Sequence, residues 1–471
     1  MKRMREKIWI FIGLVILLVL YEAVGIFISY GRHPEVSDAY KQSFQTEKFY
    51  GKEESSERAV IIEDNKEALE HRLRLIEEAE QEIILSTFDF KSDESGKDVQ
   101  AALLHAAQRG VQVRIIVDGF SAITHMRDDY FSALSSSDHV EFRAYNLPNP
   151  LLPWKTMGRM HDKYLMIDHK FYMLGGRNTY DYFLGGKGYQ NYDRDVLVYE
   201  MEPENKNTSI YELYQYFEKV WQQKECVRFR DQDGERKEVR KAKKELEERY
   251  QGFCKRYPKL EEAYSYEDIT YPVNQISILV NPSHVYGKKP EIFYSLIQLM
   301  EGARSEVRIH TPYVICNSYM YDGFRQICNG TAKVSMMTNS VANNGNPFGA
   351  SDYAIHKEEL IQTGIQIYEY EGGVSYHGKS VTIDDDLAIV GSFNMDMRSA
   401  YLDTEIMLVV HSREVTAQLN DYMDSYEEQA GKVLDKYRVE MPEGMERQKI
   451  SPKREKRVRL LKAFNWLRFL M

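Results

Sequence analysis

A pattern of histidine, lysine, aspartate, glycine and asparagine occurs twice in this chain at the same spacing. Residues 161–178 read HDKYLMIDHKFYMLGGRN, and residues 377–394 read HGKSVTIDDDLAIVGSFN. Two unrelated core histidines are the simpler alternative. However, both copies agree in their charged residues and in the distance to the glycine and asparagine. The agreement indicates an internal duplication in which two similar halves supply one site.

The duplication extends upstream of both motifs. Residues 299–313, LMEGARSEVRIHTPY, match residues 75–88, LIEEAEQEIILSTF, in several identical letters and in their apolar positions. A match of this length covers a helix and a strand ahead of each motif. Two whole lobes are therefore expected to be alike, and not two loops alone.

Helical and strand patterns alternate in the first lobe. Apolar residues at helical spacing within 69–79 precede a strand at 82–90, and a helical stretch at 99–107 leads to a strand at 111–119. This alternation is typical of a parallel or mixed sheet covered by helices. The predicted fold is α/β, with two similar lobes.

A length of 471 residues is enough for two or three domains. The expected organisation is a cytoplasmic start and membrane anchor at 1–33, a polar tether at 34–57, a first lobe at 58–225, a charged helical insert at 226–268, a second lobe at 269–435 and a basic amphipathic tail at 436–471.

An apolar run at residues 8–30 is long enough to cross a bilayer as a helix. The basic residues ahead of it are Lys2, Arg3, Arg5 and Lys7. Glu35 and Asp38 follow it, so the charge bias places the N-terminus in the cytoplasm and the bulk of the chain outside. A cleaved signal peptide is the alternative, but no clear cleavage site follows the run.

The last residues combine positive charge with large apolar side chains. The basic residues are Lys453, Arg454, Lys456, Arg457, Arg459, Lys462 and Arg468, and the apolar residues include Leu460, Leu461, Phe464, Trp466, Leu467 and Phe469. This composition favours a helix in an anionic membrane interface. Packing against the second lobe is the alternative.

The mixed charges of the insert at 226–268, by contrast, are typical of a solvated helix.

Overall composition excludes some classes of function. A net charge of −10 argues against a protein that coats nucleic acid, and no nucleic-acid partner is expected. The cysteines, Cys226, Cys254, Cys316 and Cys328, form no CxxC pair and have no zinc-type spacing. We therefore expect no metal and no cofactor. Ordinary thiols and disulfides both remain open, and no obligate protein partner is inferred.

The motif residues suit attack on a phosphodiester. We expect a hairpin in each copy, with the histidine and lysine on one strand face. Lys163 and Lys379 would balance the phosphate charge. One of His161 and His377 would attack phosphorus while the other protonates the leaving alkoxide. Which of them is the nucleophile stays open.

Further candidates surround these four residues. Asn178 and Asn394 would supply amide donors to the phosphate. Gly175, Gly176, Gly391 and Ser392 would let the backbone approach a bound oxyanion. A carboxylate is expected behind each histidine to orient its ring, and Asp195 and Glu405 are the candidates.

The paired motifs resemble those of the phospholipase D superfamily, over roughly residues 58–430. Further segments are similar to bacterial cardiolipin synthases: GGRNTYDYF at 175–183, TPYVI at 311–315, TNSVANN at 338–344, TGIQIYEY at 363–370 and GSFNMDMRS at 391–399. The chain departs from that family in one respect, because cardiolipin synthases often carry two N-terminal spans and this chain shows one.

The resemblance implies a pseudo-twofold active site between two lobes and a covalent phosphohistidine intermediate. It implies that His161, Lys163 and Asn178, with their counterparts in the second motif, do the chemistry, and that Asp168 and Asp384 are structural. The expected activity is transfer of a phosphatidyl group from phosphatidylglycerol to a second phospholipid. A hydrolase of the superfamily, acting on lipid or nucleic acid, is the alternative, and a silent lipid-binding scaffold is a third reading that both intact motifs oppose.

Overall fold

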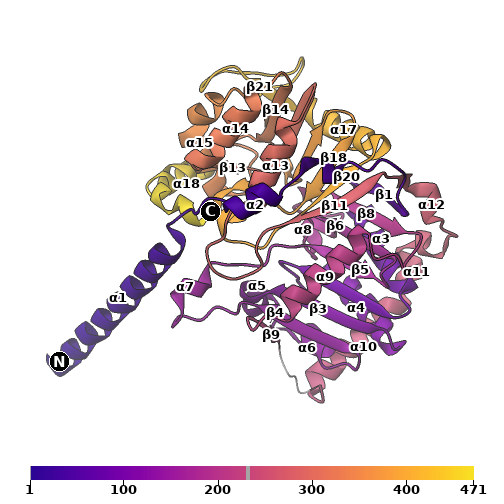
Figure 1. Cartoon of the computed structure of the whole chain (residues 1–471). Coiled ribbons are helices and arrows are strands. Elements are labelled where there is room, and N and C mark those ends of the chain that lie inside the picture. Colours follow the sequence, from indigo (N-terminus) through magenta and orange to yellow (C-terminus); the bar gives the residue numbers. More distant parts are fainter. Residues whose placement is uncertain (1, 230–233) are drawn as a thin grey trace.

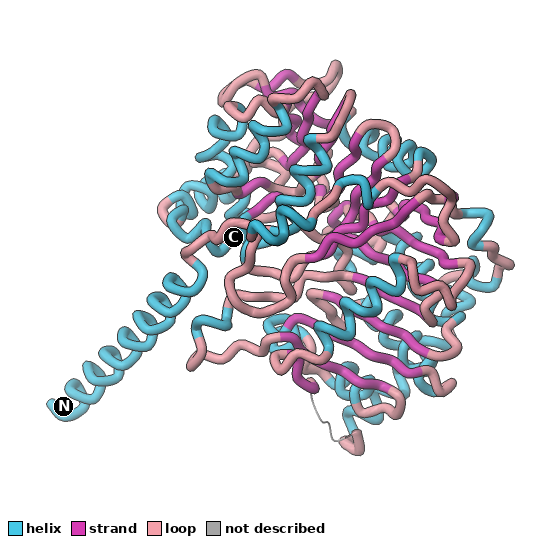
Figure 2. The backbone as a smooth tube through the Cα atoms, in the orientation of Figure 1, coloured by secondary structure: helices cyan, strands magenta, loops and turns pink. Residues whose placement is uncertain are grey.

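The computed structural model describes residues 2–229 and 234–471, in which the chain forms two nine-stranded mixed sheets (Figures 1 and 2). The first sheet runs β10 (Tyr271–Pro272), β1 (Glu57–Ile62), β8 (Asp195–Glu200), β6 (Phe171–Gly175), β5 (Tyr164–Ile167), β2 (Glu82–Thr87), β3 (Gln112–Asp118), β4 (Val140–Tyr145) and β9 (Cys226–Arg228). The second runs β11 (Gln275–Val280), β20 (Ile406–His411), β18 (Leu387–Gly391), β17 (Ser380–Ile383), β12 (Glu306–His310), β14 (Lys333–Asn339), β15 (Gln366–Tyr370), β21 (Ala430–Val433) and β22 (Val439–Glu440).

The two sheets have the same plan. In each, three strands pair in parallel, β2-β3-β4 and β12-β14-β15, and a hairpin pairs antiparallel to the first of them, β5-β6 and β17-β18. The prediction of two similar α/β lobes is confirmed.

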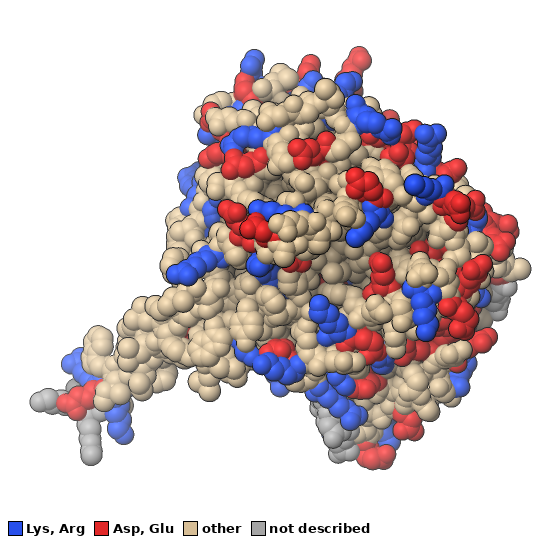
Figure 3. All heavy atoms as spheres, in the orientation of Figure 1, with Lys and Arg blue, Asp and Glu red and all other residues tan. Residues whose placement is uncertain are grey.

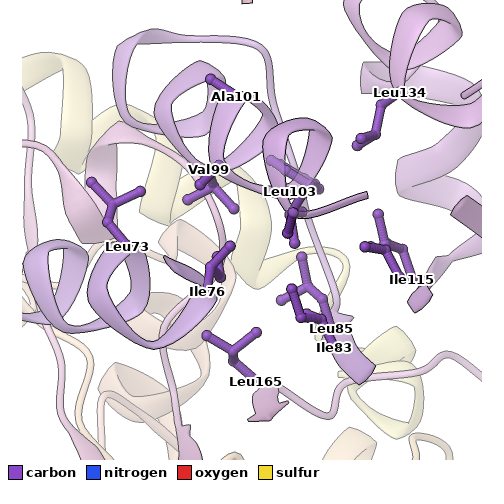
Figure 4. Close-up of a cluster of buried hydrophobic side chains, with 14 of the residues drawn as sticks. Leu73, Ile76, Ile83, Leu85, Val99, Ala101, Leu103, Ile115, Leu134 and Leu165 are labelled. Carbon is purple, nitrogen blue, oxygen red and sulfur yellow. The ribbon is translucent and has the colours of Figure 1, made fainter. Parts of the chain in front are cut away.

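Helices cover the outer face of each sheet. In the first lobe they are α3 (Asn65–Glu78) and α4 (Glu94–Gln108), with α10 (Lys237–Gln251) packed on α4. In the second lobe they are α13 (Glu291–Glu301), α14 (Ser318–Cys328) and α15 (Pro347–Ile361). Figure 4 shows Leu73 and Ile76 of α3 packed with Val99 and Leu103 of α4 above Leu85 of β2. Burial of this apolar area is the main force that holds each lobe together.

A shared core joins the lobes. The inner faces of both sheets pack in one cluster with α9 (Ser209–Trp221) and α17 (Arg413–Glu427). Ile61 and Val196 from the first lobe belong to it, as do Val390 and Leu408 from the second. The strands are thus buried on both faces, which explains their continuous apolar sequences. Because one core holds both lobes, a site between them is held rigidly.

The segment expected to be a tether packs on the second lobe. It contains α2 (Asp38–Ser43) and the 3₁₀ helix η1 (Thr46–Phe49). The Tyr40 and Phe44 rings contact Tyr294 of α13, and Phe49 is buried in the outer core of that lobe. Aromatic side chains in a polar stretch therefore hold it in place.

The charged insert packs on the first lobe. β9 extends the first sheet. α10 buries Val239, Ala242 and Leu246 in the core of the first lobe, packed against α4 and α6 (Asp129–Ser135). The charges of α10 lie mainly on its other face, where Lys241 pairs with Glu245 and Lys244 with Glu248. Residues 230–233 of the insert lie outside the described residues.

The N-terminal helix α1 (Lys2–Tyr30) projects from the body (Figure 1) and is long and apolar enough to cross a membrane. Figure 3 shows its surface largely free of charge between its N-terminal end and the body. At its base, Tyr30 is buried and its hydroxyl donates to the carbonyl of Trp154, 2.8 Å away. The base of the helix is therefore anchored in the body.

The C-terminal tail forms α18 (Pro452–Lys462) and the 3₁₀ helix η3 (Asn465–Leu470). Val458 and Phe469 are buried on the second lobe, and Arg468 forms an ion pair with Asp352 of α15. Leu460 and Trp466 stay exposed. The tail thus packs on the second lobe with one face and leaves other apolar side chains on the surface.

Candidate active site

Each motif lies at the start of an antiparallel hairpin. His161 and Lys163 precede β5 in an extended run, and His377 and Lys379 precede β17 in the same way. The hairpins predicted from the sequence are present, but the histidine and lysine lie just before the first strand and not within it. The side chains of His161 and His377 are 14% and 20% exposed, so a substrate can reach both rings.

Asp168 and Asp384 occupy the hairpin turns at the other end of these strands. Both have a left-handed backbone, with φ of 51° and 52°. The Asp168 carboxylate accepts backbone N–H groups of Glu80, Gln81 and Glu82 at 2.7–2.9 Å. Asp384 accepts the equivalent groups of residues 304–306. Each aspartate thereby ties its turn to the start of the neighbouring strand, away from the histidines.

Each motif histidine contacts a carboxylate of the other lobe. Nδ1 of His161 lies 2.9 Å from Oε1 of Glu405, and Nδ1 of His377 lies 2.6 Å from Oδ2 of Asp193. Both carboxylates are fully buried. Since Nδ1 contacts a carboxylate in both rings, Nε2 is the nitrogen left for chemistry, and in His377 it lies 3.3 Å from Nζ of Lys379.

Backbone contacts reinforce this crossing. The His161 N–H donates to the carbonyl of Thr404 at 3.2 Å, and the His377 N–H donates to that of Tyr192 at 2.6 Å. Beside them, β7 (Asn191–Tyr192) pairs in parallel with β16 (Ser375–Tyr376) across the lobe boundary. Neither half of the site is therefore complete without the other lobe.

The carboxylate expected at Asp195 lies two residues earlier, at Asp193. Asp195 instead contacts Arg72 and Arg177 in a buried ion cluster. Sheet register explains the difference: Gly175 pairs with Asp195 in the first lobe, whereas Gly391 pairs with Met407 in the second. The equivalent of Glu405 is therefore Asp193, because both stand two residues before those partners. Glu405 does contact a motif histidine, as expected. That histidine is His161 of the first motif, although Glu405 follows the second motif in the chain.

The two lysines lie beside the two histidines. Nζ of Lys163 donates to the carbonyl of His161, and Nζ of Lys379 donates to that of His377. Burial lowers the pKa of Lys163 to about 7, with a further contribution from the charge of Lys379. Burial also lowers the pKa of Lys379 and lowers that of His377 to about 4. An anionic substrate would reverse these shifts, because it favours the charged forms.

The two carboxylates differ in charge state. Burial raises the pKa of Glu405 to about 7, although it accepts hydrogen bonds from Ser392 and, at 2.6 Å, from Ser399. Burial also acts to raise the pKa of Asp193, but Lys379 and His377 outweigh it and hold that pKa well below its usual range. Asp193 is therefore a fixed anion, whereas Glu405 titrates near neutral pH.

Asn178 and Asn394 are buried at the ends of the two motifs. Oδ1 of Asn178 accepts a hydrogen bond from the backbone N–H of Asp89 at 3.3 Å. The side-chain NH₂ group of Asn178 therefore points away from Asp89. Oδ1 of Asn394 is buried and has no hydrogen-bond partner among the described residues. The two asparagines are thus held differently, although they are equivalent in sequence.

The glycines and the serine that were expected to let the backbone approach an oxyanion lie against other parts of the protein. A Cβ at Gly175 would meet the Arg194 carbonyl at 2.2 Å, and one at Gly391 would meet the Ile406 carbonyl at 2.2 Å. A Cβ at Gly176 would meet the Asp193 carboxylate at the same distance. Ser392 donates to Glu405. These positions are small because strands β8 and β20 and the orienting carboxylates lie against them.

Two phenylalanines that the sequence did not single out also border the site. The Phe88 ring meets His161 edge-on with centroids 5.3 Å apart, and the Phe183 ring meets His377 in the same way at 5.0 Å. Phe183 belongs to α8 (Asp181–Leu184) of the first lobe. Apolar walls of this kind exclude water and strengthen the electrostatic interactions inside.

A family model described as "Cardiolipin synthase, PLD-like domain" matches residues 73–221 and 296–426. These two ranges carry both motifs, Asp193 and Glu405, and together they make up more than half of the chain. The family match therefore covers both halves of the site.

Individual relatives agree with this assignment. The chain is 25% identical over 403 residues to cardiolipin synthase C of Escherichia coli K12, covering 76% of this chain and 82% of that protein. It is 24% identical over 371 residues to the major cardiolipin synthase ClsA of Bacillus subtilis 168, covering 76% and 66%.

A solved structure shows the same fold. The crystal structure of phosphatidylserine synthase from Haemophilus influenzae Rd KW20 superposes with a TM-score of 0.61 and 13% identity, covering 88% of this chain and 95% of that one. With the fold, the two motifs and the family match in agreement, this chain belongs to the cardiolipin synthase family of phospholipase D-like proteins.

Proposed function

We propose that this protein is a membrane-anchored phosphatidyltransferase that moves a phosphatidyl group from phosphatidylglycerol to a second phospholipid through a phosphohistidine. The observation that carries the proposal is the crossed pairing of His161 with Glu405 and of His377 with Asp193. It presents two reactive Nε2 atoms beside two lysines in one site. That set supplies a nucleophile, a general acid and a cradle for the phosphate charge.

In the first half-reaction, Nε2 of one histidine attacks phosphorus and a P–N bond forms. The P–O bond to the glycerol headgroup breaks, and the leaving alkoxide takes a proton from Nε2 of the other histidine. Lys163 and Lys379 offset the charge on the non-bridging oxygens. The products are free glycerol and a phosphatidyl group bound to the enzyme.

In the second half-reaction, the histidine that gave its proton acts as base. It removes the proton of an acceptor hydroxyl, whose oxygen attacks phosphorus while the P–N bond breaks. When the acceptor is a second phosphatidylglycerol the product is cardiolipin, and when it is water the product is phosphatidic acid. The motif residues treat both acceptors alike, so the choice depends on what binds beside them.

Membrane attachment fits this chemistry, because both substrates are lipids. We propose that α1 spans the membrane with its N-terminus in the cytoplasm and the lobes on the other side. Exposed apolar side chains beside its base, at Leu151 and Trp154 near the short helix α7 (Pro153–Thr156) and at Trp466 of the tail, would lie in the interface. A membrane-impermeant maleimide tests the orientation, since Cys254 is exposed. Labelling in intact cells supports it, and labelling only after lysis contradicts it.

One assay tests the reaction. The purified protein is incubated with labelled phosphatidylglycerol in detergent micelles and the lipids are separated. Cardiolipin with release of one glycerol per molecule is the expected result. Phosphatidic acid alone would show a hydrolase, and no turnover would contradict both activities.

A further inference from the structure

A basic pocket beside His377 is formed by three segments that are far apart in sequence. The first lobe contributes Tyr182 and Tyr189, the second lobe contributes Gly345, and the tail helix α18 contributes Lys453, Arg454 and Arg457. Its volume is about 410 Å³. The tail lies beyond residue 426, where the family match ends, so this pocket is built partly by a segment that the match does not cover.

The positive charge of this pocket is not neutralised by the protein. None of its three basic side chains forms an ion pair with the described residues, and no carboxylate lines the pocket. Nε and Nη2 of Arg454 are buried without a hydrogen-bond partner among the residues that the structure describes. Arg454 as a whole is half-buried, but buried guanidinium nitrogens with open donors are costly unless an anion accepts them. The next residue, Glu455, pairs with Arg459 on the outer side of the helix and not with the pocket.

The pocket wall contacts the strand that leads into the second motif. The N–H of Gly345 donates to Oγ of Ser375 at 3.1 Å, and Ser375 starts β16, which ends just before His377. Two residues of extended chain span about 7 Å. In the first-lobe wall, Tyr182 precedes Phe183, whose ring lies against His377. The backbone beside the pocket is therefore about 7 Å along the chain from His377.

That separation fits an acceptor lipid. In phosphatidylglycerol, the terminal hydroxyl oxygen and the phosphorus of the headgroup are joined through three carbons and one ester oxygen, a span of about 6 Å when extended. A phosphate held in the pocket can thus place the hydroxyl at the phosphohistidine. Arginine guanidinium groups bind phosphate in bidentate fashion, and tyrosine hydroxyls can donate to its oxygens.

We propose that Lys453, Arg454 and Arg457 of α18, with Tyr182 and Tyr189, bind the phosphate of the acceptor phospholipid and so direct the reaction to lipid and away from water. The inference rests on the proposed phosphatidyl transfer and deepens it. It assigns α18 to acceptor selection, a role separate from that of the motif residues, which act on phosphorus.

The test compares two triple variants of the full-length protein. Lys453→Ala/Arg454→Ala/Arg457→Ala removes the basic side chains of the pocket. The exposed-face variant, Lys456→Ala/Arg459→Ala/Lys462→Ala, removes the same charge from exposed positions of the same helix that do not line the pocket. Glycerol, cardiolipin and phosphatidic acid are measured at several mole fractions of phosphatidylglycerol in micelles. Arg454→Gln is a single-site companion in case the triple variant does not fold.

We expect the pocket variant to lose cardiolipin relative to phosphatidic acid by at least about tenfold, with a raised KM for acceptor and with glycerol release retained. Arg454→Gln should shift the ratio in the same direction, and the exposed-face variant should keep the wild-type ratio. Equal ratios in wild type and pocket variants would overturn the inference while leaving the transferase intact. Wild-type protein that makes no cardiolipin would instead contradict the proposed function itself.

Soluble anions distinguish a lipid phosphate from a free one. Glycerol 1-phosphate and inorganic phosphate are added to the wild-type reaction. If an added anion lowers cardiolipin and raises phosphatidic acid in the wild-type protein, and has no such effect in the pocket variant, the pocket is a lipid headgroup site. If inorganic phosphate changes the total rate of the wild-type protein but not that of the pocket variant, and leaves the product ratio unchanged, the pocket binds a soluble anion. The assignment to a lipid phosphate is then wrong.

Discussion

The two halves of the site share a backbone plan but differ in the carboxylate that each histidine receives. His377 faces Asp193, which stays ionised beside Lys379. His161 faces Glu405, whose pKa is raised to about 7 by burial. A fixed anion holds one imidazole in one tautomer at all neutral pH values, whereas a titrating partner changes with pH. Pseudo-twofold symmetry of the fold therefore does not make the two histidines chemically equal.

Replacing either histidine should have the largest effect on activity. His161→Ala and His377→Ala should each lower kcat by about three orders of magnitude or more, because each removes a nucleophile or a proton donor. Acid quenching with phosphorus-labelled phosphatidylglycerol then separates their roles. The variant that lacks the nucleophile should trap no labelled protein. Near-normal turnover by either variant would contradict a mechanism that needs both rings.

Replacing the carboxylates should show how much each histidine depends on its partner. Asp193→Asn and Glu405→Gln should lower kcat by about 10²- to 10⁴-fold, as for other carboxylates that orient a reactive histidine. The Asp193 change should have the larger effect, because it removes a permanent charge.

Asp195→Asn is the matched control for the carboxylate variants. It disturbs the ion cluster with Arg72 and Arg177 and should reduce the free energy of unfolding by about 3–5 kcal/mol. If Asp195→Asn lost activity without lowering the melting temperature, while Asp193→Asn had no effect, the assignment would be reversed.

The pH profile tests the difference in charge state. As pH rises through about 7, Glu405 loses its proton and becomes able to stabilise a protonated His161. The rate should therefore rise between pH 6 and 8, by up to about tenfold per pH unit. Glu405→Gln should lose this limb of the profile, and Asp193→Asn should keep it. An unchanged limb in Glu405→Gln would assign the titration to another group.

The turn aspartates should give the smallest effects on activity. Asp168→Asn and Asp384→Asn should each lower the free energy of unfolding by about 1–3 kcal/mol, because three backbone N–H groups lose a charged acceptor. Asparagine also tolerates the left-handed backbone, so the substitution isolates the charge. Chemical denaturation measures the loss, and kcat should stay within a few-fold. A loss of kcat as large as in Asp193→Asn would place these residues in the chemistry.

Much of the fold followed from local pattern. The repeated helix and strand ahead of each motif predicted two α/β lobes, and the apolar run at 8–30 predicted the long helix α1. The tether was harder to interpret, because Tyr40, Phe44 and Phe49 are spaced irregularly and acquire meaning only against α13. Periodic spacing of apolar residues indicates which face of a helix or strand is buried, and residues 34–57 show no such spacing.

Two copies of a histidine and lysine motif, each at the start of a hairpin, could be recognised from the residues alone, and they led us to expect a carboxylate behind each histidine. The identity of each carboxylate became clear only from the folded chain. Acidic residues stand two apart in both copies, at Asp193 and Asp195 and again at Asp403 and Glu405. Either acidic residue of a pair could therefore lie next to a histidine. Which one does so depends on strand register and on how the lobes cross, and both are set by long-range packing in the shared core.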